Sequence, residues 1–91
     1  MRVVASLQFL KKLKKMPKLR RAKVDAQIVR LQKTPDLGEE KKQDLAGVFV
    51  HKFKVNRQQL LLSYRIVGDE LQLITIGTHE NYYRDLKRYL K

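Results

Sequence analysis

Cysteine is absent from this 91-residue chain, so the protein has no disulfide framework and no thiolate metal site. The two histidines and the scattered acidic residues show no metal-ligand spacing, so we expect no metal and no small-molecule cofactor. Apolar runs long enough for a signal peptide or a membrane span are also lacking, which favours a cytoplasmic protein with no membrane partner. Internal repeats and low-complexity linkers are missing too. We therefore expect residues 1–91 to form a single domain with one modest core.

Acidic residues are few beside the basic ones. The chain has 21 Lys and Arg against 9 Asp and Glu, which gives a formal net charge of +12. A small, basic domain is expected to bind a polyanion, because neutralising phosphates releases counterions and gives affinity without sequence reading. Two alternatives remain open, namely a lysine-rich surface with no special partner and an acidic protein partner.

The first third of the sequence predicts a strand followed by a helical hairpin. Residues 1–5 are a short apolar run, and Ser6 can cap the helix that follows. Apolar residues then recur at helical spacing to about Lys33, with lysines on the opposite side of the first helix. Pro17 lies where one helix ends and the next begins, a position that suits its fixed φ.

The rest of the sequence predicts a polar loop, a meander of strands and a last helix. The loop spans residues 34–43. After it the apolar period changes from helical to alternating, and strands are expected at residues 48–55, 58–67 and 70–76. A final helix is expected at about 81–90. The fold class is therefore α+β, with an N-terminal strand and a helical hairpin packed on an antiparallel sheet and a short C-terminal helix.

Strand register assigns polar and apolar side chains to opposite faces of the predicted sheet. Two-residue loops at Asn56-Arg57 and Gly68-Asp69 fix the pairing, although a four-residue loop of the same parity is equally compatible with the first. Ser63 is then expected opposite Ile74. One face carries a polar set: Lys52, Lys54, Gln59, Ser63, Arg65 and Gln72. The other carries the apolar set that covers the helices: Phe49, Phe53, Leu60, Leu62, Tyr64, Ile66, Leu71 and Leu73.

Three basic residues of the polar face are candidate phosphate ligands. Lys52 and Lys54 stand two apart on one strand, and Arg65 shares their face, where a charged side chain needs a partner or solvent. The two lysines fit equally well as charges that keep a strand edge from aggregating. His51 has the apolar parity, which favours a satisfied, semi-buried histidine over a catalyst.

The C-terminal segment adds a second group of candidates. His79 stands at the turn into the last helix, where loops expose functional groups, and histidine exchanges protons near neutral pH. Tyr83 lies four residues later on the same side of the helix, flanked by Arg84 and Lys87, whereas Tyr82 falls at the core-facing spacing. A solvated loop histidine is the alternative. Lysine, histidine, tyrosine and arginine with few carboxylates suit RNA cleavage without a metal.

These features together resemble the RelE/ParE superfamily of bacterial toxin–antitoxin toxins over nearly the whole chain. The resemblance rests on the order β-α-α-β-β-β-α and on four segments: Leu45-Ala46-Gly47, Lys52-Phe53-Lys54, Tyr64-Arg65-Ile66-Val67 and Gly77-Thr78-His79. It implies a toxin that is neutralised by an antitoxin from the same operon. RelE-like members enter the ribosomal A site and cut mRNA there without a metal. The implied activity is therefore that of a ribosome-associated endoribonuclease, or mRNA interferase, that inhibits translation.

The resemblance also implies roles for individual residues. A YafQ-like ending maps to His79 and Tyr83, whereas a RelE-like ending maps to Tyr82, and the helical phase favours the first. One family arginine falls near Leu61, and Arg65 is the expected substitute. Catalytic roles are expected for His79, Lys54, Tyr83 and Arg65, and RNA-binding roles for Lys52, Tyr82, Arg84 and Lys87.

Two other functions remain open. ParE-like members of the superfamily poison DNA gyrase and need no nuclease site, but they typically lack the lysine pair and the tail histidine that this chain has. The third possibility is a basic nucleic-acid-binding domain without toxicity. For an antitoxin helix, fold analogy predicts a groove around Phe9, Leu13 and Val24.

Overall fold

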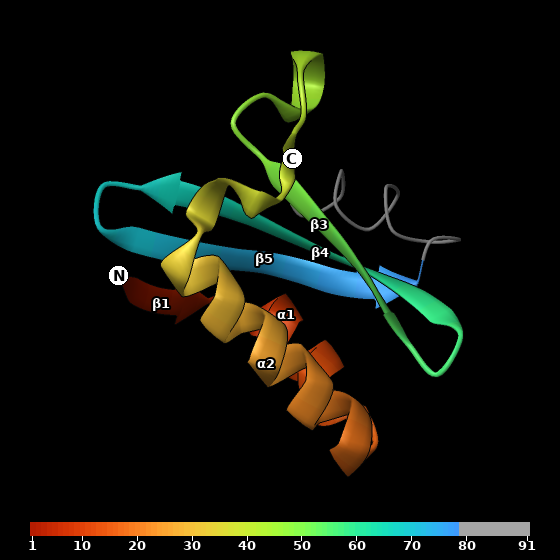
Figure 1. Cartoon of the computed structure of the whole chain (residues 1–91). Coiled ribbons are helices and arrows are strands. Elements are labelled where there is room, and N and C mark those ends of the chain that lie inside the picture. The colour runs from red at the N-terminus through yellow and green to blue at the C-terminus, as the bar shows by residue number, and fades with distance from the viewer. Residues whose placement is uncertain (79–91) are drawn as a thin grey trace.

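The computed structural model describes residues 1–78 and, within them, a five-stranded sheet with two α-helices on one of its faces (Figure 1). The elements are β1 (Arg2–Ala5), α1 (Leu7–Lys14), α2 (Lys18–Lys33), β2 (Glu39–Glu40), β3 (Phe49–Val55), β4 (Gln58–Val67) and β5 (Glu70–Thr78), with 3₁₀ turns at Pro35–Leu37 and Gln43–Leu45. The predicted α+β class is confirmed. The helix expected at residues 81–90 lies outside the described residues.

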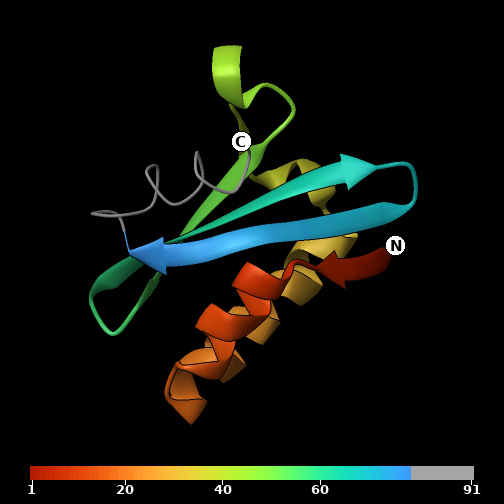
Figure 2. The same cartoon turned by 180° about the vertical axis from the view of Figure 1, so that it is seen from behind.

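The sheet is mixed, with the strand order β1-β5-β4-β3-β2. Strands β3, β4 and β5 form the antiparallel meander that the sequence predicts. Strand β1 adds in parallel to the outer edge of β5, from Arg2 beside Glu70 to Ala5 beside Leu73. Seen from behind, β1 and then α1 follow β5 (Figure 2). The N-terminal segment therefore covers one edge of the meander along its length.

Ser6 marks the junction between β1 and α1. Its Oγ accepts a hydrogen bond from the backbone N–H of Phe9 at 3.0 Å and donates one to the carbonyl oxygen of Ile74 at 2.6 Å. One hydroxyl therefore caps the helix, as predicted, and also ties its first turn to β5. Helix α2 begins directly after Pro17, whose φ of −57° suits that position, and the predicted helical hairpin is confirmed.

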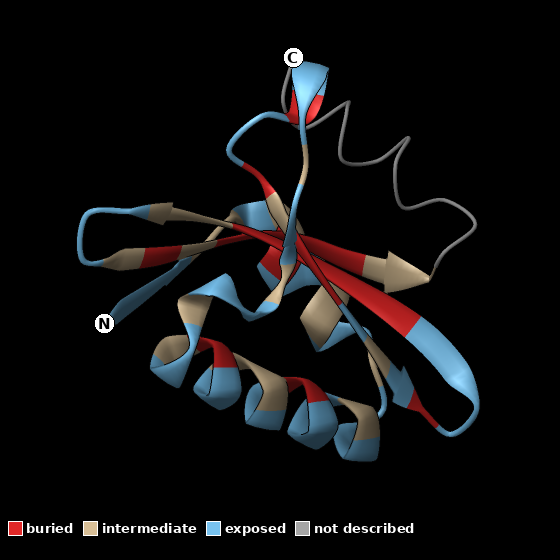
Figure 3. Ribbon diagram, turned by 45° about the horizontal axis from the view of Figure 1, so that its top comes forward, coloured by how far each residue is buried: buried red, intermediate tan, exposed pale blue. Residues whose placement is uncertain are grey.

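The main core lies between the helices and the sheet, where buried residues concentrate on the strands and on the facing side of α2 (Figure 3). Its buried members are Phe9, Val24, Leu31, Val55, Leu60, Leu62, Tyr64, Leu71, Leu73 and Ile76. The alternation along β4 sends Leu60, Leu62 and Tyr64 to the helices, as the predicted parity requires. Truncating one of the large aliphatic members to alanine should cost about 2–5 kcal/mol of folding free energy.

The β3–β4 connection is a two-residue turn. Val55 pairs with Gln58, and the intervening Asn56 and Arg57 have φ angles of 50° and 71°. Both central residues of a type I′ turn need positive φ, so the backbone matches that turn even without glycine. The four-residue alternative is thereby excluded. The turn at Gly68-Asp69 also has the predicted two-residue form.

Strand β5 contains a bulge that was not predicted from the sequence. Tyr64 pairs with Leu73 but its neighbour Ser63 pairs with Thr75, so Ile74 is an extra residue in β5. The expected pairing of Ser63 with Ile74 was therefore wrong. A bulge shifts the phase of the strand beyond it, so Leu73 and Ile76, three residues apart, both face the main core, while Ile74 belongs to a separate cluster.

The segment predicted to be a polar loop contains the short strand β2 and a tether to the core. The phenol of Tyr64 donates to the carbonyl oxygen of Pro35 at 2.6 Å and accepts from the N–H of Gly38 at 2.9 Å. A Cβ at Gly38 would lie 2.7 Å from the Tyr64 Oη and 3.0 Å from the carbonyl oxygen of Val50, so no side chain fits there. The tether therefore holds Glu39, the first residue of β2, against β3.

Candidate functional site

The sheet face that points away from the helices carries the two lysines singled out from the sequence. Lys52 lies opposite Leu61, Lys54 lies opposite Gln59, and both lysines are exposed. Phe53, between them, packs against the main core. The predicted parity of β3 is therefore confirmed, and the two Cα atoms stand about 7 Å apart on one face.

A third lysine reaches this face from α1. Gly77 lies opposite Leu61, in the cross-strand row that also contains Lys52. A Cβ on Gly77 would point to the same face as its cross-strand neighbours and would lie 3.9 Å from the Nζ of Lys12. The Lys12 ammonium therefore lies close to Gly77 at this end of the face. We call Lys12, Lys52 and Lys54 the lysine end of the face.

Strand β2 brings a carboxylate to the lysine end. Glu39 pairs with Val50, two residues before Lys52, and its Oε1 lies 2.6 Å from the Nζ of Lys41. The hydrogen bond from Lys41 and its charge hold the pKa of Glu39 below its usual range, and the charge of Lys52 contributes less. Glu39 is therefore ionised at neutral pH and offsets part of the positive charge next to Lys52.

The middle of the same face is apolar, so the predicted polar residues share a face but do not form one continuous polar surface. A second buried cluster occupies it: Leu45, Val48, Val50, Leu61 and Ile74. Arg65 has the predicted parity and lies opposite Gln72, but it follows Leu61 by four residues on β4. Its Cα is therefore about 13 Å along the strand from the row of Lys52 and about 20 Å from that of Lys54. The lysines and Arg65 share a face but stand at opposite ends.

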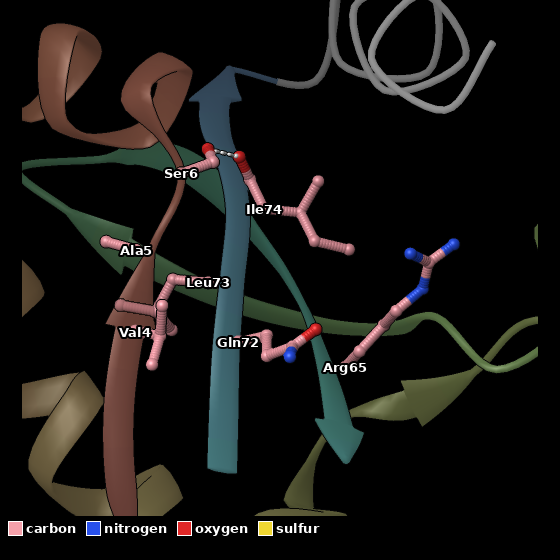
Figure 4. Close-up of a pocket in the computed structure, with 7 residues that line it drawn as sticks. All are labelled: Val4, Ala5, Ser6, Arg65, Gln72, Leu73 and Ile74. Carbon is pink, nitrogen blue, oxygen red and sulfur yellow. Dashed lines mark hydrogen bonds between the residues drawn. The ribbon is translucent and has the colours of Figure 1, made fainter.

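Arg65 lines a pocket of about 240 Å³ at the other end of this face, which we call the arginine end. Figure 4 shows Gln72 between Val4 on one side and Arg65 on the other, with Ile74 next to the guanidinium stem. Val4 is the parallel neighbour of Gln72, so β1, β5 and β4 all contribute. Within residues 1–78, Arg65 makes no ion pair or hydrogen bond through its side chain.

His51 belongs to the face that the helices cover. It is 7% exposed, its Nε2 lies 2.7 Å from the Oε1 of Gln27 on α2, and its ring stacks on Phe53. Burial lowers the pKa of His51, and the charge of Arg30 lowers it further. The prediction of a semi-buried, satisfied histidine is confirmed.

Five of the predicted site residues lie outside the described part of the chain: His79, Tyr82, Tyr83, Arg84 and Lys87. Their roles stay predictions. Lys12 and Glu39 were not predicted as members of this face, for different reasons. Helical spacing placed Lys12 on the solvent side of α1, and nothing local shows that α1 runs beside the end of β5. A two-residue strand has no period, so β2 left no signal around Glu39.

Residues 1–78 contain neither a cluster of metal ligands nor a helix that could cross a membrane. No three histidine, aspartate or glutamate side chains of this range gather in a way that could hold a metal ion. No helix in the same range is long and apolar enough to span a bilayer. The titratable groups are dispersed, with His51 on the helix side, Glu39 at the β2 edge and Glu70 beside β1.

Solved structures with the same fold include chains of bacterial toxin–antitoxin proteins. The intact E. coli RelBE complex matches with a TM-score of 0.71 and 17% identity, over 87% of this chain and 96% of that one. The Mycobacterium tuberculosis RelBE2 complex matches with a TM-score of 0.75 and 21% identity, over 86% and 96% of the two chains. A YoeB/ParE toxin from Agrobacterium tumefaciens gives 0.66 and 21%, over 87% and 99%. At such identities these likenesses show the fold alone.

The sequence itself carries the family assignment. None of the curated proteins matches it. The family model described as the ParE-like toxin of type II bacterial toxin–antitoxin systems, however, matches residues 3–87. That range takes in both helices, the meander and the lysine end. The chain therefore belongs to the ParE-like toxins of type II bacterial toxin–antitoxin systems, within the RelE/ParE superfamily.

Proposed function

We propose that this toxin is a metal-independent endoribonuclease that cuts mRNA on the ribosome and thereby inhibits translation. The observation that supports it most directly is the lysine end, where Lys52 and Lys54 project from β3 and Lys12 reaches the same face from α1. Clustered cations on an exposed sheet face suit a phosphate backbone, and the net charge of +12 favours encounter with RNA. A protein that acts on mRNA at the ribosome works in the cytoplasm.

The proposed reaction is a transesterification within the RNA strand. A base takes the proton of a 2′-OH, the 2′ oxygen bonds to the adjacent phosphorus, and the bond from phosphorus to the 5′ oxygen breaks in line. An acid protonates the departing 5′ oxygen. The products are a 2′,3′-cyclic phosphate and a free 5′-OH. Cations lower the barrier because negative charge builds on the phosphate oxygens in the transition state.

The roles at this phosphate follow from the side-chain chemistry. We assign His79 as general acid or base and Lys54 as base or electrostatic partner. Lys52 and Lys12 bind phosphate oxygens, Lys12 being the addition that the structure supports. Tyr83 stacks on a base or orients the phosphate, with Tyr82 as the alternative. Basic residues Arg84 and Lys87 supply further contacts to the RNA backbone.

Arg65 has no place at the same phosphate in this proposal. Its position about 13 Å along β4 from the Lys52 row exceeds the size of one phosphate group. The buried cluster around Leu61 and Ile74 also stands between the two ends of the face. The reacting phosphate is therefore proposed to lie at the lysine end alone.

Alanine substitution tests the site directly. His79→Ala and Lys54→Ala should each abolish cleavage of mRNA on translating ribosomes, with mapped mRNA ends as the readout. Lys23→Ala is the matched control, because Lys23 is an exposed lysine on α2, away from the sheet face. Full cleavage by both site variants would refute the proposed centre, as would equal loss in the control.

The antitoxin is the second partner, because the family consists of toxins from toxin–antitoxin systems. The groove expected around Phe9, Leu13 and Val24 is not open to a partner, because Phe9 is only 1% exposed and Val24 is fully buried in the core. Apolar surface is instead exposed on the outer side of α1, at Leu7 (75%) and Leu10 (48%). We propose that a cognate antitoxin covers this surface, and Leu10→Glu should weaken the complex in a pull-down.

Inhibition of DNA gyrase is the second candidate function, and the ParE-like name of the matching family favours it. A gyrase inhibitor would block supercoiling by purified gyrase and would leave mRNA ends unchanged. Lys54→Ala would then retain its toxicity, because no nuclease site is needed. The two assays run on one protein preparation separate the two activities.

A further inference from the structure

The pocket at the arginine end lies beside the bulge in β5. Ile74 follows Gln72 by two residues, so its side chain lies on the face that carries Gln72 and Arg65, and the phase of β5 changes directly after it, where Thr75 pairs with Ser63. Bulges concentrate beside functional sites, where they re-aim side chains. The irregularity and the pocket coincide.

The polar groups of this pocket have unused hydrogen-bonding capacity. The guanidinium of Arg65, a planar array of donors, has no partner among residues 1–78. The amide of Gln72 donates to the carboxylate of Glu70 at 3.1 Å, which leaves its own oxygen as an acceptor. Arg2 lies 3.7 Å from the same carboxylate and offsets its charge. The pocket therefore has a positive rim although it includes a neighbouring acid.

Apart from Ser6, the remaining residues that line the pocket are apolar. Val4 lies on one side, and Ile74 lies on the other, next to the stem of Arg65 (Figure 4). A volume of about 240 Å³ is small for a complete drug-sized ligand, and suits one planar ring with its substituent. A site with guanidinium donors, an amide and apolar walls matches a phosphate joined to a nucleobase.

We propose that this pocket binds one nucleotide of a single-stranded RNA at a distance from the reacting phosphate. Arg65 holds that nucleotide's phosphate, Gln72 contacts the edge of its base, and Ile74 and Val4 pack against the base. The inference rests on the proposed function, because the pocket at the arginine end is a second binding site for the RNA strand that is cut at the lysine end. Its consequence is that binding depends on RNA length, since a strand must span about 13 Å or more to engage both ends.

Binding of 2′-O-methyl RNA tests the pocket without cleavage, because the attacking 2′-OH is blocked. Affinity of the wild-type protein should rise in a step when the oligonucleotide becomes long enough to span both ends. Arg65→Gln should remove the step, weakening binding of an octanucleotide about tenfold, the size expected for one charged hydrogen-bonded contact. It should also reduce the dependence of log affinity on log salt by about 0.7, the value for one phosphate of a single strand.

Two further variants make the result specific. Arg21→Gln removes an equal charge from the exposed side of α2 and should keep the length step. Arg65→Lys should keep the salt dependence but recover only part of the affinity, because an ammonium lacks the planar donor array. A step that survives in Arg65→Gln, or a wild type that shows no step, would overturn the pocket assignment.

Cleavage assays separate this inference from the proposed function. With Arg65→Gln, KM for long substrates should rise while kcat stays unchanged, since the reacting phosphate is elsewhere. Loss of kcat in this variant would contradict a distant anchor. A protein that shows the length step but never cleaves RNA would refute the nuclease proposal and keep the pocket. Cleavage without the step would refute the pocket alone.

Discussion

Replacing Tyr64 with phenylalanine should destabilise the toxin through the loss of two hydrogen bonds made by one oxygen. The phenol donates to the carbonyl oxygen of Pro35 at 2.6 Å and accepts from the N–H of Gly38 at 2.9 Å. Tyr64 itself is completely buried, and its ring stacks on Phe49 with the centroids 5.4 Å apart. Phenylalanine keeps that ring contact, so the change in the free energy of unfolding reports the contribution of the hydroxyl group.

The size of the effect follows from these contacts. Each intramolecular hydrogen bond contributes about 1 kcal/mol net, and a partner left unsatisfied in a partly buried site costs about 1–3 kcal/mol. Two bonds from one oxygen therefore predict a loss of about 2–4 kcal/mol for Tyr64→Phe. With a urea slope of about 2 kcal/mol per molar, the midpoint of unfolding should fall by about 1–2 M.

Urea unfolding followed by circular dichroism measures this loss, and the slope of the free energy against urea concentration should stay constant.

Burial raises the pKa of Tyr64. The hydrogen bond from Gly38 opposes this increase, and the charge of Asp36 adds to it. A raised pKa means that the neutral phenol stabilises the fold below about pH 10 and that this contribution is lost as pH rises further. The wild type should therefore lose stability in strong alkali and the variant should lose less. A change below about 0.5 kcal/mol would refute the role of the tether.

Other substitutions test individual contacts and backbone conformations of the same structure. Gly38→Ala should be strongly destabilising because its Cβ meets Tyr64 at 2.7 Å, whereas Gly77→Ala, with only a 3.9 Å contact, should unfold in urea much as the wild type does. Arg57→Gly should raise the free energy of unfolding by about 1 kcal/mol, since it relieves a left-handed residue; an unchanged free energy of unfolding would argue against the observed turn. His51 has a lowered pKa, so its contribution is present above about pH 6.5 and is lost as pH falls. His51→Gln should flatten that loss in thermal melts between pH 7 and pH 5, and an unaltered pH dependence would contradict it.

The strand parity could be predicted because one local rule determines it. Alternation places Lys52 and Lys54 on one face and Phe53 on the other, and a turn of even length preserves that assignment on β4. Uncertainty about the length of the turn at Asn56-Arg57 did not matter, because both alternatives had the same parity. The predicted face of Arg65 is therefore confirmed, although the prediction did not include the distance between Arg65 and the lysines.

The sequence indicates the apolar middle of the face, but a rule of strict alternation does not take this indication into account. Leu61 has the parity of the polar set, and Leu73 and Ile74 are adjacent apolar residues that break the alternation of β5. The core-facing residues Leu71, Leu73 and Ile76 show the same break, with a spacing of two followed by three. A change of phase within one strand is what a bulge produces. The change of phase is therefore visible in the sequence, but an unbroken strand is the simpler interpretation of the same residues.

The contributions of Lys12 and Glu39 could not be predicted from local pattern. Each reaches the face through an element whose partner is distant in sequence, α1 beside the end of β5 and β2 beside β3. Neither pairing follows from period, turn or capping signals. Only the packed arrangement brings the Lys12 ammonium over Gly77 and the Glu39 carboxylate near Lys52.

The separation of the two ends determines how residue roles can be assigned in this chain. Solved relatives at 17–21% identity share its fold, so their residues do not transfer position by position. The register of this chain supplies the missing constraint, because it fixes which cations can reach one phosphate. Lys52 and Lys54 meet that condition, and Arg65 does not. Loss of kcat in Lys54→Ala together with loss of length-dependent binding in Arg65→Gln would show two anchors on one strand. Identical defects in the two variants would show that the sheet face acts as a single site and that the distance argument fails.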